Sequence, residues 1–571
     1  MNVFGNIGTK IGTNNIVKQC LSSLVSLFLI LGMVPQSAFG EVPAQDLVIS
    51  SVDELIAFRD EVNGGNNFSG KIVKLAADLD VSSESPWVPI GNSSSKPFKG
   101  TFDGDGHKIT GLHLNASQNY QGLFGYVYGT VEKLTLEGVT CDEGSGNYVG
   151  GICGYSGSGS TISNCTVTGD INGGYDVGGI CGYGSNISNC TFSGTVNGSR
   201  DVGGICGYNY SSVTDCIVSG TVNGSSNNVG GICGYLFYSS VTDCIVSGTI
   251  TGGNNTVGGI CGYASGSSVI ITACAVLADV SGKVTVGGIC GTTADVTDCY
   301  AVGNITGESE VGGIIGGAPS TCSNYKNNVK SCFFAGTLTG TGTSSVCYVG
   351  GIGGYDVSDS FENCVCLASK IEGTGDPDID IIGYISAAYS AEKPGSSLQG
   401  ASVETGNDSD CYYHADLNSS TGTSYDGESF DLESGWQQKM FGQTLSWDTT
   451  VWDIPDVSSP AYSIAALPTL KALPSTIKQM PYLDKKVPKL SDFIAALPDK
   501  LDYDGKPKAI TITPKSGITG MGAVTVKYYK VENGSTTLLD GPPTDAGRYK
   551  VKFDVAAGTE YFSLNDLPAV L

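Results

Sequence analysis

The segment that decides the fold is VGGICGY, which begins at Val149 and recurs seven times in the same or a closely similar form. The copies follow one another at 25 to 29 residues, with 38 residues before the last one. Self-similarity at a nearly fixed period is the sequence signature of a repeat fold. The later copies begin at Val177, Val202, Val229, Val257, Val286, Val311 and Val349.

Each repeat has a second half, which is clearest as SSVTDCIVSGTVNG from Ser211. Apolar and polar residues alternate from Cys216 to Val222, which is the period of a β-strand, and Gly, Asn and Ser residues separate the alternating runs. A unit of two or three short strands cannot bury its own apolar face, so neighbouring units must stack. The sequence therefore predicts an all-β protein built on a right-handed parallel β-helix, or solenoid, with one repeat per coil.

Paired glycines open every repeat, as at Gly150-Gly151 and Gly203-Gly204. They indicate either a bend or a close approach of two backbones, because glycine has no Cβ and tolerates positive φ. Phosphate binding is the rival interpretation. It is disfavoured because no helix follows the pairs and no GxxxxGK[ST] motif occurs.

The N-terminal forty residues have the pattern of a secretory signal peptide. Lys10 and Lys18 precede an apolar stretch, Leu21–Val34, and small residues follow at Ser37–Gly40. The alternative is a membrane anchor, but a spanning helix needs about 20 apolar residues. We therefore expect a secreted or cell-surface protein of bacterial type, with no membrane span after signal removal.

The charge balance argues against nucleic acid as a partner. The chain has 55 acidic and 30 basic residues, a formal charge of -25, and arginine only at positions 59, 200 and 548. Binding to phosphates requires a basic patch, which this composition does not supply. The acidity is typical of a soluble secreted surface, and ion binding is the alternative.

Cysteines recur at two places in the repeat. Stacked residues of a parallel sheet have Cβ atoms about 4.8 Å apart, whereas a disulfide needs about 3.8 Å. We therefore expect buried free thiols, with disulfides as the alternative. With only three histidines, a zinc site is disfavoured, and we expect no metal or cofactor. The two columns are Cys153, Cys181, Cys206, Cys233, Cys261 and Cys290, and Cys165, Cys190, Cys216, Cys244, Cys274, Cys299, Cys332 and Cys364.

A family resemblance rests on the stretch before the repeats. PWVPIGNSSSKPFKGTFDGDGHKITGLHLN (86–115) and QGLFGYVYGTVEKLTLEG (121–138) resemble the GLUG-repeat family of bacterial exported proteins, with Gly122–Gly125 similar to its naming motif. The resemblance covers about residues 47–475 and implies an extracellular scaffold or adhesin-like module. Related repeats flank immunoglobulin A1 metalloproteases, but the HExxH motif of those peptidases cannot be formed from His107, His113 and His414.

Other elements are expected at the two ends of the array. VDELIAFRDEVN (52–63) places Val52, Leu55, Ile56 and Val62 on one helical face, which predicts a helix that caps the first coil. The segment 503–555 resembles the small immunoglobulin-like modules called YDG or MBG, which implies a small β-sandwich. The predicted divisions are a signal peptide (1–40), an N-terminal cap with the first coils (41–115), the GLUG-type solenoid (116–425), its C-terminal end (426–475), a linker (476–500) and a YDG/MBG-type module, either whole or truncated (501–571).

Two outward columns are candidate sites. Asp215, Asp243 and Asp298, with asparagine in other repeats, could bind calcium or act as catalytic carboxylates, but hydrogen bonding at a turn explains them better. A tyrosine follows the first cysteine of several repeats and forms either a ligand-binding ladder or an aromatic column that packs a corner. These tyrosines are Tyr155, Tyr183, Tyr208, Tyr235 and Tyr263.

Nearly interchangeable repeats favour a binding role over catalysis, because active sites tend to interrupt a repeat. We therefore expect a non-catalytic extracellular scaffold or adhesin-like protein, a monomer, that presents a repetitive surface to glycans or proteins. The alternative is a carbohydrate-active β-helix enzyme, a polysaccharide lyase or hydrolase, since fold alone does not determine function.

Overall fold

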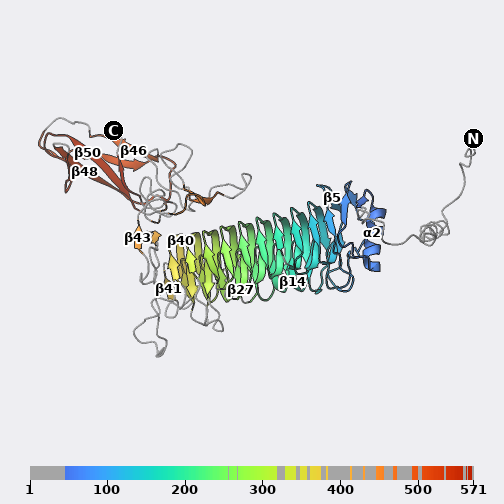
Figure 1. Ribbon diagram of the computed structural model, residues 1–571. Helices are drawn as coiled ribbons and strands as arrows, with labels where there is room; N and C mark the ends of the chain where they lie inside the picture. Colours follow the sequence, from blue (N-terminus) through green and yellow to red (C-terminus); the bar gives the residue numbers. More distant parts are fainter. Residues whose placement is uncertain are drawn as a thin grey trace, which may run out of the picture. The chain divides into compact units, whose positions relative to one another are not determined.

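The computed structural model describes residues 46–317 except positions 185, 255, 267 and 293, most of residues 328–373, and shorter stretches between residues 381 and 568. Within this part, strands stack coil upon coil into a parallel β-solenoid, and the α-helix α2 (Val52–Gly64) lies at its N-terminal end (Figure 1). The predicted solenoid is confirmed. The predicted signal peptide lies outside the described residues.

Most full coils have four short strands, not the two or three that the sequence suggested; the coil that begins at Val286 has three, with isolated bridges at Cys290 in place of the second strand. One coil consists of β18 (Arg200–Gly203), β19 (Cys206–Asn209), β20 (Ser212–Thr214) and β21 (Ile217–Gly224). The paired glycines separate the two strands of the first half of the repeat, β18 and β19. A left-handed corner at Asp215 separates the two strands of the second half, β20 and β21. Every strand pairs in parallel with its counterpart one repeat away, and identical residues come into register.

The equivalent strands of successive coils form four long sheets. The twelve-stranded sheet contains β1 (Leu47–Ile49), β2 (Ile72–Leu75), β4 (Thr101–Asp103), β8 (Thr130–Glu132), β12 (Thr161–Ser163), β16 (Asn186–Ser188), β20, β24 (Ser240–Thr242), β28 (Ile270–Thr272), β31 (Asp295–Thr297), β35 (Asn328–Lys330) and β39 (Ser360–Glu362). The nine-stranded sheet contains β10 (Val149–Gly150), β14 (Tyr175–Gly178), β18, β22 (Val229–Gly230), β26 (Thr256–Gly258), β30 (Thr285–Gly287), β33 (Glu310–Gly312), β37 (Tyr348–Gly350) and β41 (Ile381–Gly383).

The other two sheets carry the candidate site and the longest strands. The six-stranded sheet contains β7 (Phe124–Val127), β11 (Cys153–Ser156), β15 (Cys181–Gly184), β19, β23 (Cys233–Phe237) and β27 (Cys261–Ser265), and β34 (Ile315–Gly317) pairs with β38 (Gly353–Tyr355). The fourteen-stranded sheet contains β3 (Leu79–Asp80), β5 (Lys108–Thr110), β6 (His113–Leu114), β9 (Thr135–Cys141), β13 (Thr166–Asn172), β17 (Thr191–Gly198), β21, β25 (Ile245–Gly252), β29 (Ala275–Ser281), β32 (Tyr300–Gly307), β36 (Phe333–Gly340), β40 (Val365–Gly373), β42 (Tyr412–His414) and β43 (Glu428–Phe430).

The corner before the second cysteine explains the Asp/Asn column. Asp215 has a φ of 53° and Asn189 a φ of 50°, in the left-handed region that asparagine and aspartate tolerate better than most residues. The same corner is occupied by Asn164, Asp243, Ala273, Asp298, Ser331 and Asn363, all with φ between 52° and 55°. Backbone geometry thus accounts for Asp and Asn at this corner, and side-chain hydrogen bonding to the turn backbone stays a prediction.

The paired glycines are required by close packing and not by positive φ. A Cβ on Gly203 would overlap the carbonyl oxygens of Cys206 and Ile232, because the backbones of neighbouring coils meet there without side chains between them. Gly220 is a different case. It has a φ of 147°, and a Cβ would overlap the carbonyl group of Gly194 one coil away.

The cysteines lie inside the solenoid as small apolar residues. Cys181 and Cys206 are fully buried and in register, and the Sγ atoms of Cys153 and Cys181 are 3.4 Å apart. All seventeen described cysteines are free, and burial raises the pKa of thiols such as Cys233. Ile315 replaces cysteine in one coil and is equally buried. The column therefore needs apolar volume and no covalent bond.

The N-terminal helix forms where the sequence predicted it. Ser51 is the N-cap, and its side chain accepts a hydrogen bond from the Glu54 backbone N–H, while Gly65 ends the helix with a φ of 113°. Leu55 and Val62 are buried as expected. Val52 and Ile56 are only partly buried, because the helix presents Phe58 and Arg59 to the first coils.

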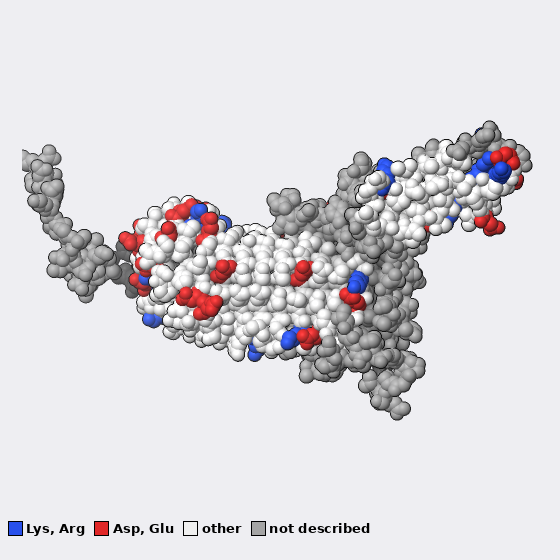
Figure 2. Space-filling view, turned by 180° about the vertical axis from the view of Figure 1, so that it is seen from behind, with Lys and Arg blue, Asp and Glu red and all other residues white. Residues whose placement is uncertain are grey.

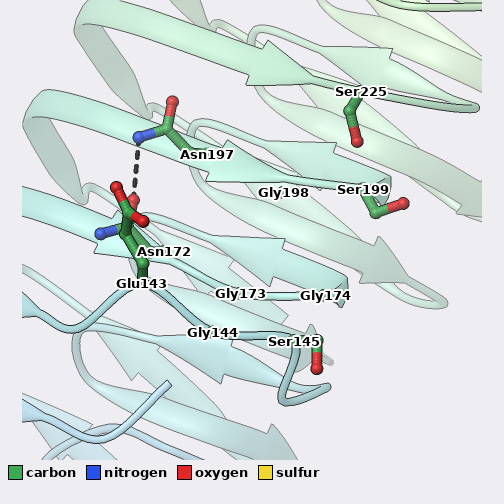
Figure 3. A pocket seen from close by; sticks show the side chains of 10 residues that line it. All are labelled: Glu143, Gly144, Ser145, Asn172, Gly173, Gly174, Asn197, Gly198, Ser199 and Ser225. Atoms are coloured by element: carbon green, nitrogen blue, oxygen red, sulfur yellow. Dashed lines mark hydrogen bonds between the residues drawn. The ribbon is translucent and has the colours of Figure 1, made fainter. Parts of the chain in front are cut away.

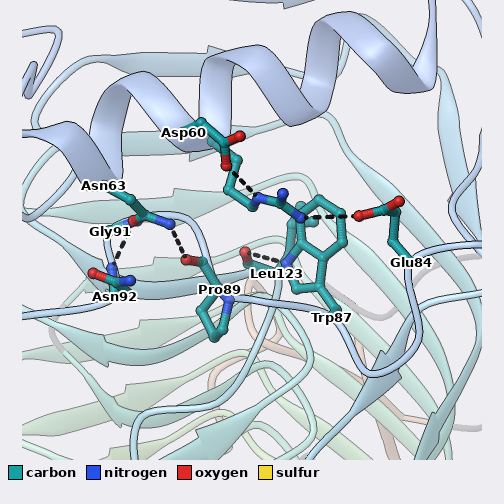
Figure 4. Close-up of polar contacts among 9 residues, drawn as sticks. Asp60, Asn63, Glu84, Trp87, Pro89, Gly91, Asn92 and Leu123 are labelled. Atoms are coloured by element: carbon teal, nitrogen blue, oxygen red, sulfur yellow. Dashed lines mark hydrogen bonds and ion pairs between the residues drawn. The ribbon is translucent and has the colours of Figure 1, made fainter. Parts of the chain in front are cut away.

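Polar contacts fix this cap in addition to apolar packing. Asn63 accepts hydrogen bonds from the backbone N–H groups of Gly91 and Asn92 at 2.9 and 3.0 Å and donates to the Pro89 carbonyl at 3.1 Å (Figure 4). The Arg59 guanidinium lies 5.1 Å from the Trp87 ring centroid. The helix therefore closes the open edge of the first coil, as edge protection requires.

An aromatic strap packs against the outside of the fourteen-stranded sheet. We use this name for the described residues 441, 445, 447–454 and 467–471, which include β44 (Trp452–Asp453) and its antiparallel partner β45 (Thr469–Leu470). Trp452 is fully buried, its ring lies 6.1 Å from the Tyr300 ring, and its Nε1 donates to Asp298 Oδ1 at 3.0 Å. The strap thus covers coils from the C-terminal half of the array.

The C-terminal segment forms small antiparallel sheets. β49 (Ser535–Leu538), β48 (Val524–Glu532), β50 (Tyr549–Val555) and β51 (Leu564–Pro568) form one sheet, and β46 (Phe493–Ala496) pairs with β47 (Thr511–Pro514). β46 lies inside the stretch 476–500, which was predicted as a linker. These residues form a strand because they pair with β47. The immunoglobulin-like sandwich and the other domain boundaries stay predictions.

Candidate functional site

The predicted tyrosine column is a continuous stack on the outside of the six-stranded sheet. Ring centroids of neighbouring members lie 4.7 to 5.2 Å apart, and the first three pairs are within 9° of parallel. The parallel register dictates this arrangement, since Tyr183 faces Tyr208 and Tyr208 faces Tyr235 in the strand pairing. We call Tyr155, Tyr183, Tyr208, Tyr235 and Tyr263 the tyrosine ladder.

Stacking determines which part of each ring a ligand can reach. The faces of Tyr183, Tyr208 and Tyr235 point along the solenoid axis and are covered by neighbouring rings, so a ligand meets ring edges and hydroxyl groups. Burial is the main cause of the raised pKa values of Tyr183 and Tyr208, and the pKa of Tyr183 rises to about 12. The hydroxyls therefore remain protonated near neutral pH, and each can both donate and accept hydrogen bonds.

Further aromatic rings extend the ladder, and the sequence analysis missed them. Tyr126 lies one coil before Tyr155, with ring centroids 5.6 Å apart, and stands in FGY where later repeats have CGY. Other aromatic residues stand two positions after a tyrosine of the column in the sequence, and their rings lie beside the stack. Several of them are more than a third exposed. These flanking residues are Tyr128, Tyr210 and Phe237, followed by Tyr238. The shared offset after the ladder tyrosine was the signal that could have identified them.

A polar column runs beside the ladder at the start of the nine-stranded sheet. Asp176 and Asp201 occupy left-handed positions, with φ of 55° and 56°, one coil apart. Asp201 accepts from Arg200 Nε at 3.1 Å and from Asn228 Nδ2 at 2.6 Å, whereas burial and the nearby Asp201 raise the pKa of Asp176 to about 7. This carboxyl group can change its charge near neutral pH.

A groove lies at the turn between the fourteen-stranded and nine-stranded sheets. It has a volume of about 410 Å³ and crosses the turns of successive coils (Figure 3). The groove residues Asn172 and Asn197 belong to a chain of hydrogen bonds, in which Asn223 donates to Asn197 at 2.9 Å and Asn197 donates to Asn172 at 2.8 Å. The lining residues are Glu143, Gly144, Ser145, Asn172, Gly173, Gly174, Asn197, Gly198, Ser199 and Ser225.

Charge is sparse over much of the solenoid. Figure 2 shows one face on which most surface atoms of the middle coils belong to uncharged residues, with acidic side chains concentrated nearer the N-terminal end. Among the described residues, no three His, Cys, Asp or Glu side chains gather as metal ligands would. In the same part of the chain, no helix has the length and apolar character needed to cross a membrane.

Comparison with known proteins identifies the repeats. The GLUG motif matches residues 145–172, 173–197, 198–223 and 225–251. The chain contains GLUG repeats. Each matched segment begins shortly before a pair of glycines and ends within a long strand of the fourteen-stranded sheet, such as β17 or β21. The earlier Gly122–Gly125 quartet lies outside the matched residues.

Two proteins resemble parts of this GLUG-repeat chain. Halomucin from Haloquadratum walsbyi is 34% identical over 149 residues, which are 24% of this chain and 2% of halomucin, so the chain spans only a small fraction of that relative. The crystal structure of a candidate immunoglobulin A1 protease from Bacteroides ovatus aligns with 75% of this chain and 93% of its own, at 17% identity and a TM-score of 0.27.

Proposed function

We propose that this GLUG-repeat chain is a non-catalytic extracellular scaffold with an adhesin-like role, secreted or held at a bacterial cell surface. The tyrosine ladder is the observation that carries the proposal. It places five tyrosine rings in one row, with neighbouring ring centroids 4.7 to 5.2 Å apart, on coils that are otherwise nearly equivalent. A row of this kind suits a long ligand that repeats with the solenoid.

Extended glycans fit this row better than extended polypeptides. A β-strand advances about 3.3 Å per residue, so its side chains on one face repeat at about 6.6 Å and fall out of register with the ladder. One sugar unit of an extended β-linked chain has a length close to the ladder interval. Sugar hydroxyls also complement phenol hydroxyls, which both donate and accept. We therefore propose glycans as the principal partners, and proteins as the second class.

Replacing hydroxyls without disturbing the stack separates binding from packing. A variant with Tyr183, Tyr208 and Tyr235 changed to Phe keeps the rings and removes three hydroxyls. We expect binding to immobilised glycans and mucins to fall at least about tenfold, since each lost hydrogen bond contributes about 0.5–1.5 kcal/mol. Tyr529→Phe, on the C-terminal sheet, is the control. If the triple variant binds like wild type, the ladder serves packing alone.

A carbohydrate-active enzyme is the second candidate, because Asp176 has a pKa of about 7 beside a second carboxyl group. Pairs of carboxyls with separated pKa values perform acid and base chemistry in glycosidases. Asp201 is only 3% exposed, however, and is bonded to Arg200 and Asn228, so substrate cannot reach it. Release of reducing sugar from bound glycans, lost in Asp176→Asn, would establish the enzyme instead.

A further inference from the structure

We propose that the groove at the turn between the fourteen-stranded and nine-stranded sheets is a second binding site, which takes one or two units of a neutral sugar. It is distinct from the tyrosine ladder and stands whether or not the ladder binds glycans. Its volume of about 410 Å³ lies within the range of small-molecule pockets, roughly 300–1,000 Å³.

Glycines at the turns supply part of the groove lining as bare backbone. Gly173 and Gly198 lie against the Val177 and Val202 side chains, where a Cβ would be too close, so the turn must carry glycine for packing reasons. The groove runs across several coils, with Glu143 and Asn172 at one side of the view and Ser199 and Ser225 at the other (Figure 3).

The polar groups that line the groove are fixed in place but retain hydrogen-bonding capacity. Asn197 Nδ2 donates to Asn172 Oδ1, and Asn172 Nδ2 donates to the Cys141 carbonyl at 2.9 Å. Each amide still has a second N–H and a second lone pair. Within the described part of the chain, the hydroxyls of Ser145, Ser199 and Ser225 have no hydrogen-bond partner, so donors and acceptors are available together.

This chemistry selects the class of ligand. Hydroxyl and amide groups complement the neighbouring hydroxyls of a sugar, whereas an apolar ligand finds no aromatic or aliphatic side chain among the lining residues. Glu143 is the sole charged group in the lining, which disfavours an anion. One carboxylate also falls short of the several oxygen ligands that calcium requires. A neutral saccharide satisfies all three conditions.

The test uses the full chain and neutral trisaccharides as probes, namely chitotriose, cellotriose and maltotriose, with trigalacturonate as the anionic comparison. Binding is measured by titration calorimetry and by saturation-transfer NMR. Ser199→Trp should fill the groove and weaken binding of the accepted neutral trisaccharide at least tenfold. Asn254→Trp, at an exposed turn of a later coil outside the groove, is the matched control and should bind like wild type.

Three outcomes would overturn the proposal: none of the neutral probes binds, trigalacturonate binds in preference to them, or Ser199→Trp binds as well as wild type. The triple Tyr→Phe ladder variant should leave trisaccharide affinity unchanged. Loss of affinity in that variant, with no effect of Ser199→Trp, would assign the sugar to the ladder and refute the groove site. The two sites are therefore tested independently.

Discussion

Asp176→Asn should stabilise the solenoid at pH 8 and lose this advantage as the pH falls. Burial and Asp201 raise the pKa of Asp176 to about 7 from an ordinary value of 3.8. Between these two pH values the folded chain holds a proton that the unfolded chain has released, so stability decreases as pH rises from about 4 to about 7. Above pH 7 the free energy of unfolding is lowered by the full cost of the buried charge on Asp176, and below pH 4 this cost vanishes.

The size of the effect follows from the shift in pKa. About three units at 1.36 kcal/mol each correspond to about 4 kcal/mol. Because the side chain is partly exposed and water screens part of its charge, we expect a gain of about 2 kcal/mol for Asp176→Asn at pH 8. Asparagine suits the backbone, since Asn228 holds the same left-handed position two coils later, with a φ of 58°.

Hydrogen exchange followed by mass spectrometry measures this difference locally, which matters because a repeat array need not unfold in one step. Peptides that cover β14 and β18 should exchange more slowly in the variant than in wild type at pH 8, and equally in both at pH 4. Asp215→Asn controls for the effect of asparagine on a left-handed corner. Faster exchange of the variant at pH 8, or an equal difference at both pH values, would refute the reasoning.

Three further predictions concern the backbone, the strap and the thiols. Gly220→Ala should lower stability by about 3 kcal/mol, because it combines a φ of 147° with overlap on Gly194, and an unchanged melting temperature would contradict this. Trp452→Phe removes the 3.0 Å bond to Asp298, whose pKa burial already raises, so we expect a loss of about 1–2 kcal/mol and faster proteolysis of the strap. Equal cleavage rates would exclude a role for this bond. Ellman's reagent should find the sixteen buried described thiols unreactive in the native protein and reactive after denaturation, and a shortfall after denaturation would reveal disulfides.

Inward-facing residues made the solenoid predictable from the sequence. Val202, Cys206 and Val218 recur with the period of a strand and the period of the repeat together, and all three are buried. Their environment is supplied by copies of themselves, so the sequence contains both partners of each contact. The helix at 52–64 was predictable for a similar reason, because its cap and its spacing are local. The number of four strands in most coils was not predictable, because the paired glycines split a strand only through their close contact with the backbone of the next coil.

Outward-facing residues of the candidate site depend on neighbours that the repeat does not specify. The tyrosine column was visible, but which ring surfaces stay open is decided by stacking angles, such as the 8° between Tyr208 and Tyr235. The groove could not be predicted from the sequence, since the residues that line it come from the turns of several coils. Burial, together with Asp201 one coil away, raises the pKa of Asp176, and both causes depend on the folded arrangement of the strands.

The outer face of the fourteen-stranded sheet shows how one repeat position can change its role along the array. The residue after the second cysteine is Thr191 in an early coil, Ile217 in the next and Tyr300 in a later one, and Tyr300 is fully buried under the strap. Phe333 stacks on Tyr300 with ring centroids 4.9 Å apart and the rings 1° from parallel. Tyr300 and Phe333 belong to an apolar cluster with the strap residues Trp447 and Trp452, apart from the core inside the solenoid, so the change serves the strap contact. At Tyr300 and Phe333, an outward substitution that breaks the repeat thus marks a contact with another segment, whereas the tyrosine ladder preserves the repeat, as expected of the surface that we propose for binding.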